Sequence, residues 1–323
     1  RSSWDHCSAI VREAELRGFD SVLLPSGYEL GLDTVAMASA LARDTHRIRL
    51  LTAIRTGENW PPQLARQIAT LQHLSSDRID INIISSDLAG QTMASAPRYQ
   101  RTLNVMTALD ELLRGESSEW DTPDFSFRAT PPRIASGHRP PFYFGGLSPD
   151  ARDVAARMAD VYLMWPDTTP AVEEIIRDMR ARAQAYGRTL RFGYRVHVIV
   201  RETEAEAREH AEYLVAALDD EIGRAIRARS LDATSVGVAR QSELRDGADE
   251  DGYAEPHLWT GIGRARSGCG AAIVGSAEQV IEKIQSYQRL GIEAFIFSGY
   301  PHREECRYVG ELVLPHLTHA PLY

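Results

Sequence analysis

The segment PFYFGGLSPDARDVAARMADVYLMWP, residues 141–166, contains one complete unit of the predicted fold. An apolar run at 141–145 ends in glycine, and a second apolar run follows at 161–165. Between them, residues 149–158 begin with a proline after a serine, which is the pattern of a helix start. Short apolar strands that alternate with helices are typical of a parallel sheet covered by helices. The segment therefore predicts a strand, a helix and a second, parallel strand.

The same alternation continues through most of the chain. Further strands are predicted at 19–25, 47–54, 78–84, 191–200 and 294–299. Further helices are predicted at 4–16, 32–43, 62–74, 98–113, 171–186, 203–218, 277–290 and 304–314. Continuous alternation over this length favours an α/β fold of the (β/α)8 TIM barrel type over an open doubly wound sheet.

The number of predicted strands is one fewer than such a barrel needs. Because the first predicted element, Trp4–Leu16, is already a helix, we expect the first strand to lie upstream of Arg1. A stretch rich in proline, serine and threonine at 117–139 is predicted to be irregular, and an insertion at about 219–271 precedes the last strand. No stretch has the composition of a linker, so residues 1–323 are expected to form a single barrel domain.

The composition is that of a globular protein with a sizeable core. Hydrophobic residues make up 43% of the chain and charged residues 25%, ordinary values that argue against wholesale disorder. A net charge of −9 argues against a surface for nucleic acid or an anionic membrane, and no apolar run approaches the roughly 20 residues of a membrane helix. Three cysteines without CxxC spacing indicate a reducing compartment. We therefore expect a cytoplasmic protein.

Two polar residues interrupt the apolar strand predicted at 191–200. Arg195 and His197 are two positions apart, so their side chains point to the same face of the strand. Tyr300 follows the last predicted strand, directly before a helix. In a barrel, these three side chains can converge at the carboxyl ends of the strands, where chemistry takes place. Arg195 and His197 can instead be paired with acidic neighbours, because a buried arginine is costly without a partner. A functional site is the favoured interpretation.

Three further features suit a phosphate or a planar cofactor. Gly146 lets the backbone approach a ligand, and the helix that begins after Ser148 offers free N–H groups to a phosphate. Arg98 and Tyr99 open another helix near the same face, and Asn82 is an amide within an apolar strand. Each feature has an ordinary alternative: a turn with a serine cap, a solvated helix start, and a hydrogen bond to a neighbouring loop.

A glycine-rich segment at 261–268 carries Arg266. Its spacing does not match a dinucleotide-binding fingerprint, and no strand precedes it. We interpret it either as a loop that folds over a pocket or as a flexible surface loop. His302 with Glu304 and Glu305 does not predict a metal site, because acidic residues after a proline are better explained by helix capping and the helix dipole.

Together these features resemble the bacterial-luciferase-like flavin monooxygenases, and within them the FMNH2-dependent alkanesulfonate monooxygenases. The segments that carry the resemblance run in order through nearly the whole chain: RIDINIISSD (78–87), RY (98–99), YFGGLS (143–148), YLMW (162–165), RFGYRVHVIVRE (191–202), LWTGIG (258–263), RSGCG (266–270) and FSGYPH (297–302). The first segments are shared with the wider group, and the last four are specific to the sulfonate branch.

This resemblance implies a (β/α)8 barrel that holds FMN, as FMNH2, at the carboxyl ends of its strands. It also implies a two-component system, in which a separate NAD(P)H:FMN reductase supplies the reduced flavin. The implied reaction uses O2 to convert a small alkanesulfonate to an aldehyde and sulfite. A homodimer or homotetramer is expected from the resemblance as well.

The resemblance also assigns roles to individual residues. Arg195 and Arg266 would grip the sulfonate, and an arginine fork suits a three-oxygen anion better than the point charge of lysine. His197 would shape the site, and Tyr300 would assist proton transfer. The residues that would contact FMN are Asn82, Arg98, Tyr99, Gly146 and Ser148.

One departure from the family pattern concerns the substrate. Where the sulfonate enzymes have an active-site cysteine after the second strand, this loop reads PSGYELGL (25–32), with Leu30 at the corresponding position. A leucine in place of this cysteine changes the wall of the pocket, which could then fit a different substrate. The alternative is therefore a luciferase-like monooxygenase that oxygenates a sulfone, an amine or an aldehyde.

Overall fold

The computed structural model of the chain describes residues 3–28, 31–219, 221, 223, 235–264 and 268–323. Within these ranges, a curved wall of parallel strands follows the order of the chain, each strand pairing with the next. Its strands are β1 (Ser21–Leu24), β2 (Arg49–Arg55), β3 (Ile79–Ile84), β6 (Phe142–Phe144), β7 (Val161–Met164), β8 (Arg191–Arg201) and β12 (Ala294–Ser298).

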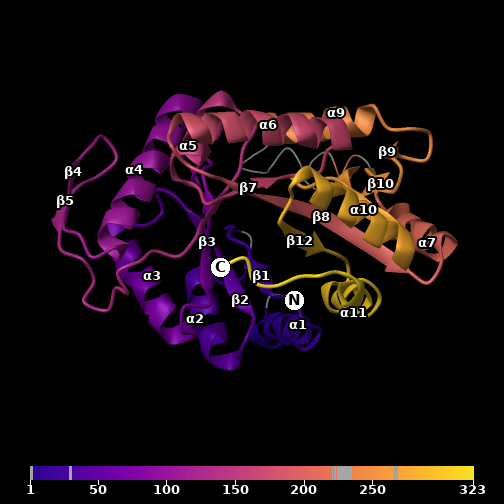
Figure 1. Ribbon diagram of the computed structural model, residues 1–323, viewed down its shortest axis with the longest axis horizontal. Coiled ribbons are helices and arrows are strands. Elements are labelled where there is room, and N and C mark those ends of the chain that lie inside the picture. The colour runs from indigo at the N-terminus through magenta and orange to yellow at the C-terminus, as the bar shows by residue number, and fades with distance from the viewer. Residues whose placement is uncertain (1–2, 29–30, 220, 222, 224–234, 265–267) are drawn as a thin grey trace.

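Helices surround this wall (Figure 1). They are α1 (Trp4–Leu16), α2 (Thr34–Asp44), α3 (Pro61–Ser75), α4 (Ser95–Leu113), α5 (Pro149–Met158), α6 (Thr169–Ala185), α7 (Glu204–Ala216), α10 (Ala277–Leu290) and α11 (His302–Leu312). Alternate residues of each strand pack against the helices, as Ile79, Ile81 and Ile83 of β3 do in the main core. No helix in the described ranges is long and apolar enough to cross a membrane.

The intervening residues of the strands fill the inside of the barrel. Leu51, Tyr143 and Val161 form a small interior core, and Leu322 of the C-terminal tail packs against it. Arg191, at the amino end of β8, donates a hydrogen bond to the carbonyl oxygen of Leu322 at 2.7 Å. The tail therefore closes the amino ends of the strands and leaves the carboxyl ends for ligands.

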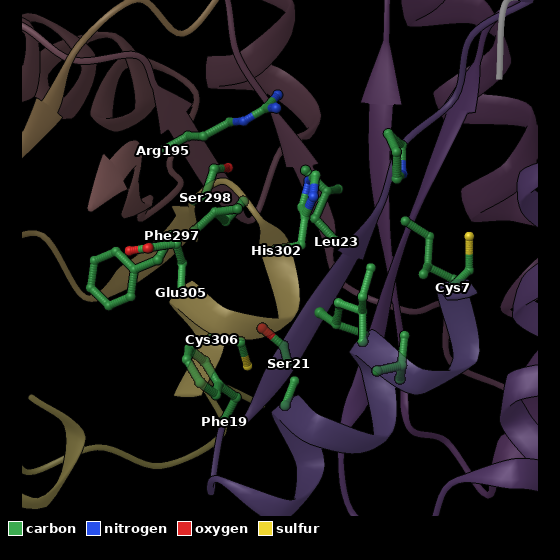
Figure 2. Close-up of a pocket in the computed structure, with 18 of the residues that line it drawn as sticks. Cys7, Phe19, Ser21, Leu23, Arg195, Phe297, Ser298, His302, Glu305 and Cys306 are labelled. Atoms are coloured by element: carbon green, nitrogen blue, oxygen red, sulfur yellow. The ribbon is translucent and has the colours of Figure 1, made fainter. Parts of the chain in front are cut away.

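The wall has a seam between β1 and β12. Among the described strands, β1 pairs with β2 alone and β12 with β8 alone. Every residue of β12 is partly exposed, and a cavity of about 400 Å³ lies between the two strands, α1 and α11. Figure 2 shows this seam cavity, with Ser21 and Leu23 on one side and Phe297 on the other. The eighth strand stays a prediction, and β1 and β12 are the two edges that it would join.

Two parts of the structure differ from the predicted elements. The stretch 117–139, predicted to be irregular, contains the antiparallel hairpin of β4 (Ser118–Asp121) and β5 (Ser126–Ala129), which projects beside α3 and α4 (Figure 1). Phe127 stacks on Phe125 with ring centroids 5.6 Å apart, so aromatic packing supports strands that are too short to give a clear pattern in the sequence.

In addition, β11 (Ala272–Ser276) pairs in parallel with the carboxyl-terminal half of β8 and has no counterpart among the predicted strands.

The insertion before β12 is tied to the carboxyl end of β7. Its described elements are α9 (Val236–Asp246), β9 (Tyr253–Glu255), β10 (Leu258–Trp259) and a 3-10 turn at Gly261–Arg264. Arg240 of α9 forms a bidentate ion pair with the buried Asp167, at 2.7 and 2.8 Å. The neighbouring Gln241 donates to the carbonyl oxygen of Pro166 at 2.7 Å. These contacts hold the insertion over the end of the barrel where chemistry is expected.

A second anchor of the insertion depends on pH. Glu255 accepts hydrogen bonds from Lys283 at 2.6 Å and from the backbone of Thr169 at 2.9 Å. Burial alone raises the pKa of Glu255, but these partners outweigh it and hold the pKa below its usual range. A carboxylate with a lowered native pKa stabilises the fold above its unfolded pKa and loses that contribution as the pH falls through the native pKa.

We therefore expect Glu255→Gln to destabilise the protein more at neutral than at acid pH. Urea unfolding of both proteins between about pH 7 and about pH 3 measures this difference. The gap between their free energies of unfolding should shrink as the pH falls. A gap that stays constant over this range would show that the Glu255 charge is not the source of the stability.

Candidate active site

Arg195 and His197 lie on the interior face of β8, in the middle of this long strand and level with the carboxyl ends of its neighbours β7 and β12. In register, Arg195 is opposite Ile296 of β12 and His197 is opposite Ser298. Val196, between them, packs into the helix-facing core. His197 is 1% exposed, whereas Arg195 is only partly buried and lines the seam cavity. The prediction that the two side chains share a face is confirmed by this register.

Tyr300 lies beside His197 at the start of α11. The two rings are stacked with centroids 5.6 Å apart, and the ring of His302 meets Tyr300 edge-on at 4.9 Å. Below them, the buried Glu305 pairs with Arg201 at 2.6 Å. The structure thus brings together three of the four residues predicted for catalysis, Arg195, His197 and Tyr300, at the carboxyl end of β12, beside β8.

The fourth predicted catalytic residue, Arg266, lies outside the described residues, as does Leu30. The first described residues after Arg266 are close to Arg195: Cys269 donates a hydrogen bond from Sγ to the carbonyl oxygen of Arg195 at 3.3 Å. Gly268 packs closely against Trp165, the residue that follows β7: a Cβ atom added to Gly268 would lie 3.4 Å from the Trp165 ring. Figure 2 shows Arg195, Ser298 and His302 at the border of the seam cavity.

The residues predicted to contact a cofactor gather between α4 and α5. A Cβ on Gly146 would stand 2.6 Å from Cβ of Ala151 and 3.4 Å from the hydroxyl of Tyr99, so only glycine leaves this space open. Ser148 caps α5 by accepting a hydrogen bond from the backbone of Ala151 at 3.2 Å. Tyr162 donates to the carbonyl oxygen of Gly146 at 2.6 Å, which holds the turn in place.

Arg98 adds a positive charge to this cluster. Its guanidinium lies 5.3 Å from the centroid of the Tyr99 ring and pairs with Asp87 at 3.3 Å. Its Nε is buried and has no hydrogen-bond partner within the described ranges. A buried N–H without an acceptor costs about 1–3 kcal/mol, so a bound anion would stabilise this position. Together with the N-terminus of α5, the cluster suits a phosphate group.

Asn82 occupies the interior face of β3. Its neighbours in register are Ala53 of β2 and Tyr143 of β6, and its side chain is partly exposed. The amide therefore lies within the barrel, on the face that Arg195 also occupies, where it can meet the polar edge of a planar ligand.

Two buried arginines were not selected from the sequence. Arg55 ends β2 and Arg101 lies in α4, and each is 5% exposed. The available signal was the position of Arg55, which closes an apolar strand and precedes a turn with Gly57. Among the described residues, no group of three histidine, cysteine, aspartate or glutamate side chains is arranged to hold a metal ion.

The match to known families agrees with this geometry. A family model described as luciferase-like monooxygenase matches residues 1–294. The chain belongs to this family. The predicted fold class and the resemblance to luciferase-like enzymes are thereby confirmed, and the chain is a monooxygenase.

Two relatives of this luciferase-like monooxygenase are named for a sulfonate substrate. The chain is 58% identical to sulfoquinovose monooxygenase of Novosphingobium aromaticivorans, over all of this chain and 91% of that protein. It is 47% identical to sulfoquinovose monooxygenase of Agrobacterium fabrum, over all of this chain and 85% of that protein. Among solved structures, riboflavin lyase with a modified FMN and riboflavin shares the fold, with a TM-score of 0.79 at 19% identity, over 97% of this chain and 84% of that one.

Proposed function

We propose that this chain is the oxygenating component of a two-component system that uses FMNH2 and O2 to release sulfite from sulfoquinovose. This compound is a glucose derivative with a sulfonate on its terminal carbon. The two relatives named for it match the whole chain. A small alkanesulfonate, the substrate expected from the sequence, is the alternative within the same chemistry.

The observation that carries this proposal is the position of Arg195. Arg195 lies on the interior face of β8, two residues from His197 and level with the carboxyl ends of β7 and β12. A sulfonate is a permanent anion with three oxygens, and a planar guanidinium can donate two parallel hydrogen bonds to it. Arg266 is proposed as the second cation. His197 and Tyr300, stacked beside Arg195, are proposed to shape the site and move a proton.

The cluster between α4 and α5 is proposed to hold FMN. The phosphate of FMN is proposed to bind beside Tyr99. There Gly146 leaves the turn open, Ser148 begins α5 with its free N–H groups, and Arg98 offers an N–H without a hydrogen-bond partner among the described residues. Asn82 then lies within the barrel for the polar edge of the ring. When bound and reduced, the flavin supplies the two electrons that the reaction needs.

The proposed reaction balances with one O2 and one FMNH2. The substrate carbon loses its bond to sulfur and one of its bonds to hydrogen and gains a double bond to oxygen, which gives an aldehyde. The released proton leaves with the sulfite as hydrogen sulfite. The second oxygen atom takes two electrons and two protons and leaves as water, while FMNH2 becomes FMN. Within this scheme Arg195 is proposed to hold the leaving sulfite, and Tyr300 is proposed to exchange a proton.

The direct test supplies the enzyme with photoreduced FMN and air in the presence of sulfoquinovose, hexane-1-sulfonate or dimethyl sulfone. We expect sulfite and an aldehyde from a sulfonate. Oxygen incorporation into a substrate without sulfite release would favour the sulfone, amine or aldehyde alternative. The reductase partner, the homodimer or homotetramer, and the cytoplasmic location stay predictions.

The phosphate-binding role makes a further prediction for Gly146→Ala. The added methyl group meets Ala151 at 2.6 Å, so we expect the affinity for FMN to fall about tenfold, equal to about 1.4 kcal/mol. Fluorescence titration with FMN measures the affinity. Gly187→Ala is the matched control, because Gly187 also has a positive φ, of 67°, but a Cβ there meets nothing within 4 Å. Equal affinities in both variants would remove Gly146 from the flavin site.

A further inference from the structure

A polar cavity of about 490 Å³ lies between the loops that follow β1, β2 and β3. Its volume falls in the range of roughly 300–1,000 Å³ that is typical of small-molecule sites. The side chains around it carry hydrogen-bonding groups: the Tyr28 hydroxyl, the Asp33 and Glu58 carboxylates, and the amides of Asn59 and Gln91. We call it the loop cavity. Such a lining suits a ligand with many hydroxyl groups and not an alkyl chain.

The loop cavity adjoins the seam cavity that Arg195 lines. Leu32 and Thr34 line both cavities, so the two cavities are neighbours on either side of these residues. The loops after β1 and β2 follow the carboxyl ends of their strands, the end of the barrel at which Arg195 also lies.

Arg55 lies behind the residues that line the loop cavity and contacts them directly. Its Nη2 donates to the carbonyl oxygen of Ser26 at 3.5 Å, and its Nε is 3.3 Å from the Glu58 carboxylate. Nη1 is buried and lacks a hydrogen-bond partner among the described residues, and Nε is held by the ion pair with Glu58. The guanidinium carbon lies 5.9 Å from the centroid of the Tyr28 ring, so Arg55 contacts three residues that line the cavity.

Arg101 approaches the same cavity from α4. A Cβ at position 57 would stand 2.8 Å from the guanidinium carbon of Arg101, so Gly57 is required for this packing. Nε and Nη2 of Arg101 are also buried without a hydrogen-bond partner in the part of the chain that the structure describes. Buried guanidinium N–H groups are costly without acceptors. Arg55 and Arg101 thus place two buried positive charges behind the wall of the cavity that Gly57 and Glu58 form.

The acceptor side of the loop cavity is provided by Glu58. Asp33 already caps α2 by accepting a hydrogen bond from Ala36 at 2.8 Å. The Glu58 side chain is 26% exposed, and burial together with a hydrogen bond to Glu58 raises the pKa of Tyr28. A carboxylate beside guanidinium donors can bind adjacent hydroxyl groups, each of which both donates and accepts.

We propose that the loop cavity binds the hydroxylated part of the substrate, with the Glu58 carboxylate as acceptor and the Asn59 amide as donor, and so selects a sugar sulfonate over an alkyl sulfonate. This inference rests on the proposed function. A site built for hydroxyl groups rejects an analogue without them, because its own buried polar groups are then left unpaired.

The test compares sulfoquinovose with hexane-1-sulfonate, which share the sulfonate and differ in the hydroxyl groups. The variants are Glu58→Ala and Asn59→Ala, both in a surface loop, and the control is Glu116→Ala, an exposed residue after α4. The KM and kcat of sulfite release are measured for each substrate, and calorimetry measures binding of each sulfonate without turnover. FMN affinity is measured in parallel.

The wild-type protein should bind sulfoquinovose at least tenfold more tightly than hexane-1-sulfonate. Glu58→Ala should raise the KM and the dissociation constant of sulfoquinovose about 10- to 100-fold, as expected for a lost charged hydrogen bond. The values for hexane-1-sulfonate, the affinity for FMN and the control should stay unchanged.

The outcomes separate the two proposals. Equal effects of Glu58→Ala and Asn59→Ala on both sulfonates, or no effect on sulfoquinovose, would overturn the sugar subsite while sulfite release stands. A wild-type preference for hexane-1-sulfonate would do the same. Release of sulfite from neither substrate would instead overturn the proposed function, and the subsite with it.

Discussion

Arg195→Ala is expected to lower kcat for sulfite release by about 10²- to 10³-fold, the usual cost of removing a preorganised donor at a reacting anion. The affinity for FMN should change little, because the groups proposed for the phosphate lie between α4 and α5. Arg195→Lys should recover only part of the rate, since an ammonium keeps the charge but loses the planar fork. Steady-state kinetics and an FMN titration measure the two quantities separately.

Arg191→Ala provides the control on the same strand. Arg191 is also at the interior side of β8 but at its amino end, where it binds the carbonyl oxygen of Leu322. Its loss should affect stability and leave kcat near the wild-type value. If Arg195→Ala lowers FMN affinity as much as turnover, Arg195 holds the flavin or the fold and is not aimed at the sulfonate.

Arg201→Ala is expected to lower the free energy of unfolding by about 3–5 kcal/mol, the cost of removing the guanidinium that pairs with the buried Glu305 and leaving His210, 3.3 Å away, beside it. The side chains of Arg201 and Glu305 are 11% and 3% exposed, and two hydrogen bonds of 2.6 and 3.1 Å join them. The pair connects the end of β8 to α11, directly below Tyr300. Urea unfolding monitored by circular dichroism measures the loss.

The matched control is Arg128→Ala in the hairpin β4–β5. Arg128 also pairs with a glutamate, Glu119, at 2.6 Å, but both side chains are largely exposed, at 80% and 64%. Surface pairs contribute little because water screens them, so this variant should unfold like the wild type.

The double variant Arg201→Met/Glu305→Leu should recover much of the stability that Arg201→Ala loses, since both charges of the pair are then replaced by apolar groups. If Arg201→Ala and Arg128→Ala lowered the free energy of unfolding by similar amounts, burial of the Arg201–Glu305 pair would not be the source of its contribution to stability.

The positions of the helices and strands of the barrel wall could be predicted from the sequence to within a few residues, whereas α9, β9 and β10 within the insertion and β11 after it were not predicted. The predicted helix Trp4–Leu16 and strand 191–200 correspond to α1 and β8. This works because the spacing of apolar residues records which side of each element is buried. The hairpin β4–β5 was missed because four-residue strands flanked by proline and serine give no such spacing. The hairpin is packed instead by aromatic rings: Phe125 contacts both Trp120 of β4 and Phe127 of β5.

The sequence also predicted those parts of the candidate site that depend only on the geometry of a single strand or turn. Arg195 and His197 share a face because strand residues alternate, and Gly146 precedes a capped helix because that turn has a local signature. The stacking of Tyr300 on His197 depends instead on β12 lying next to β8, which no local pattern encodes.

By itself the sequence determined the order of strands and helices, the barrel class and the strand face that carries Arg195, since each follows from short-range periodicity. Only the tertiary structure decided that Arg55 and Arg101 are buried beside one cavity and that the C-terminal tail closes the opposite end of the barrel. Arg101 reaches Gly57 from a helix more than 40 residues away along the chain. Burial of a charged side chain depends on such distant neighbours, and a sequence pattern around an arginine does not record them.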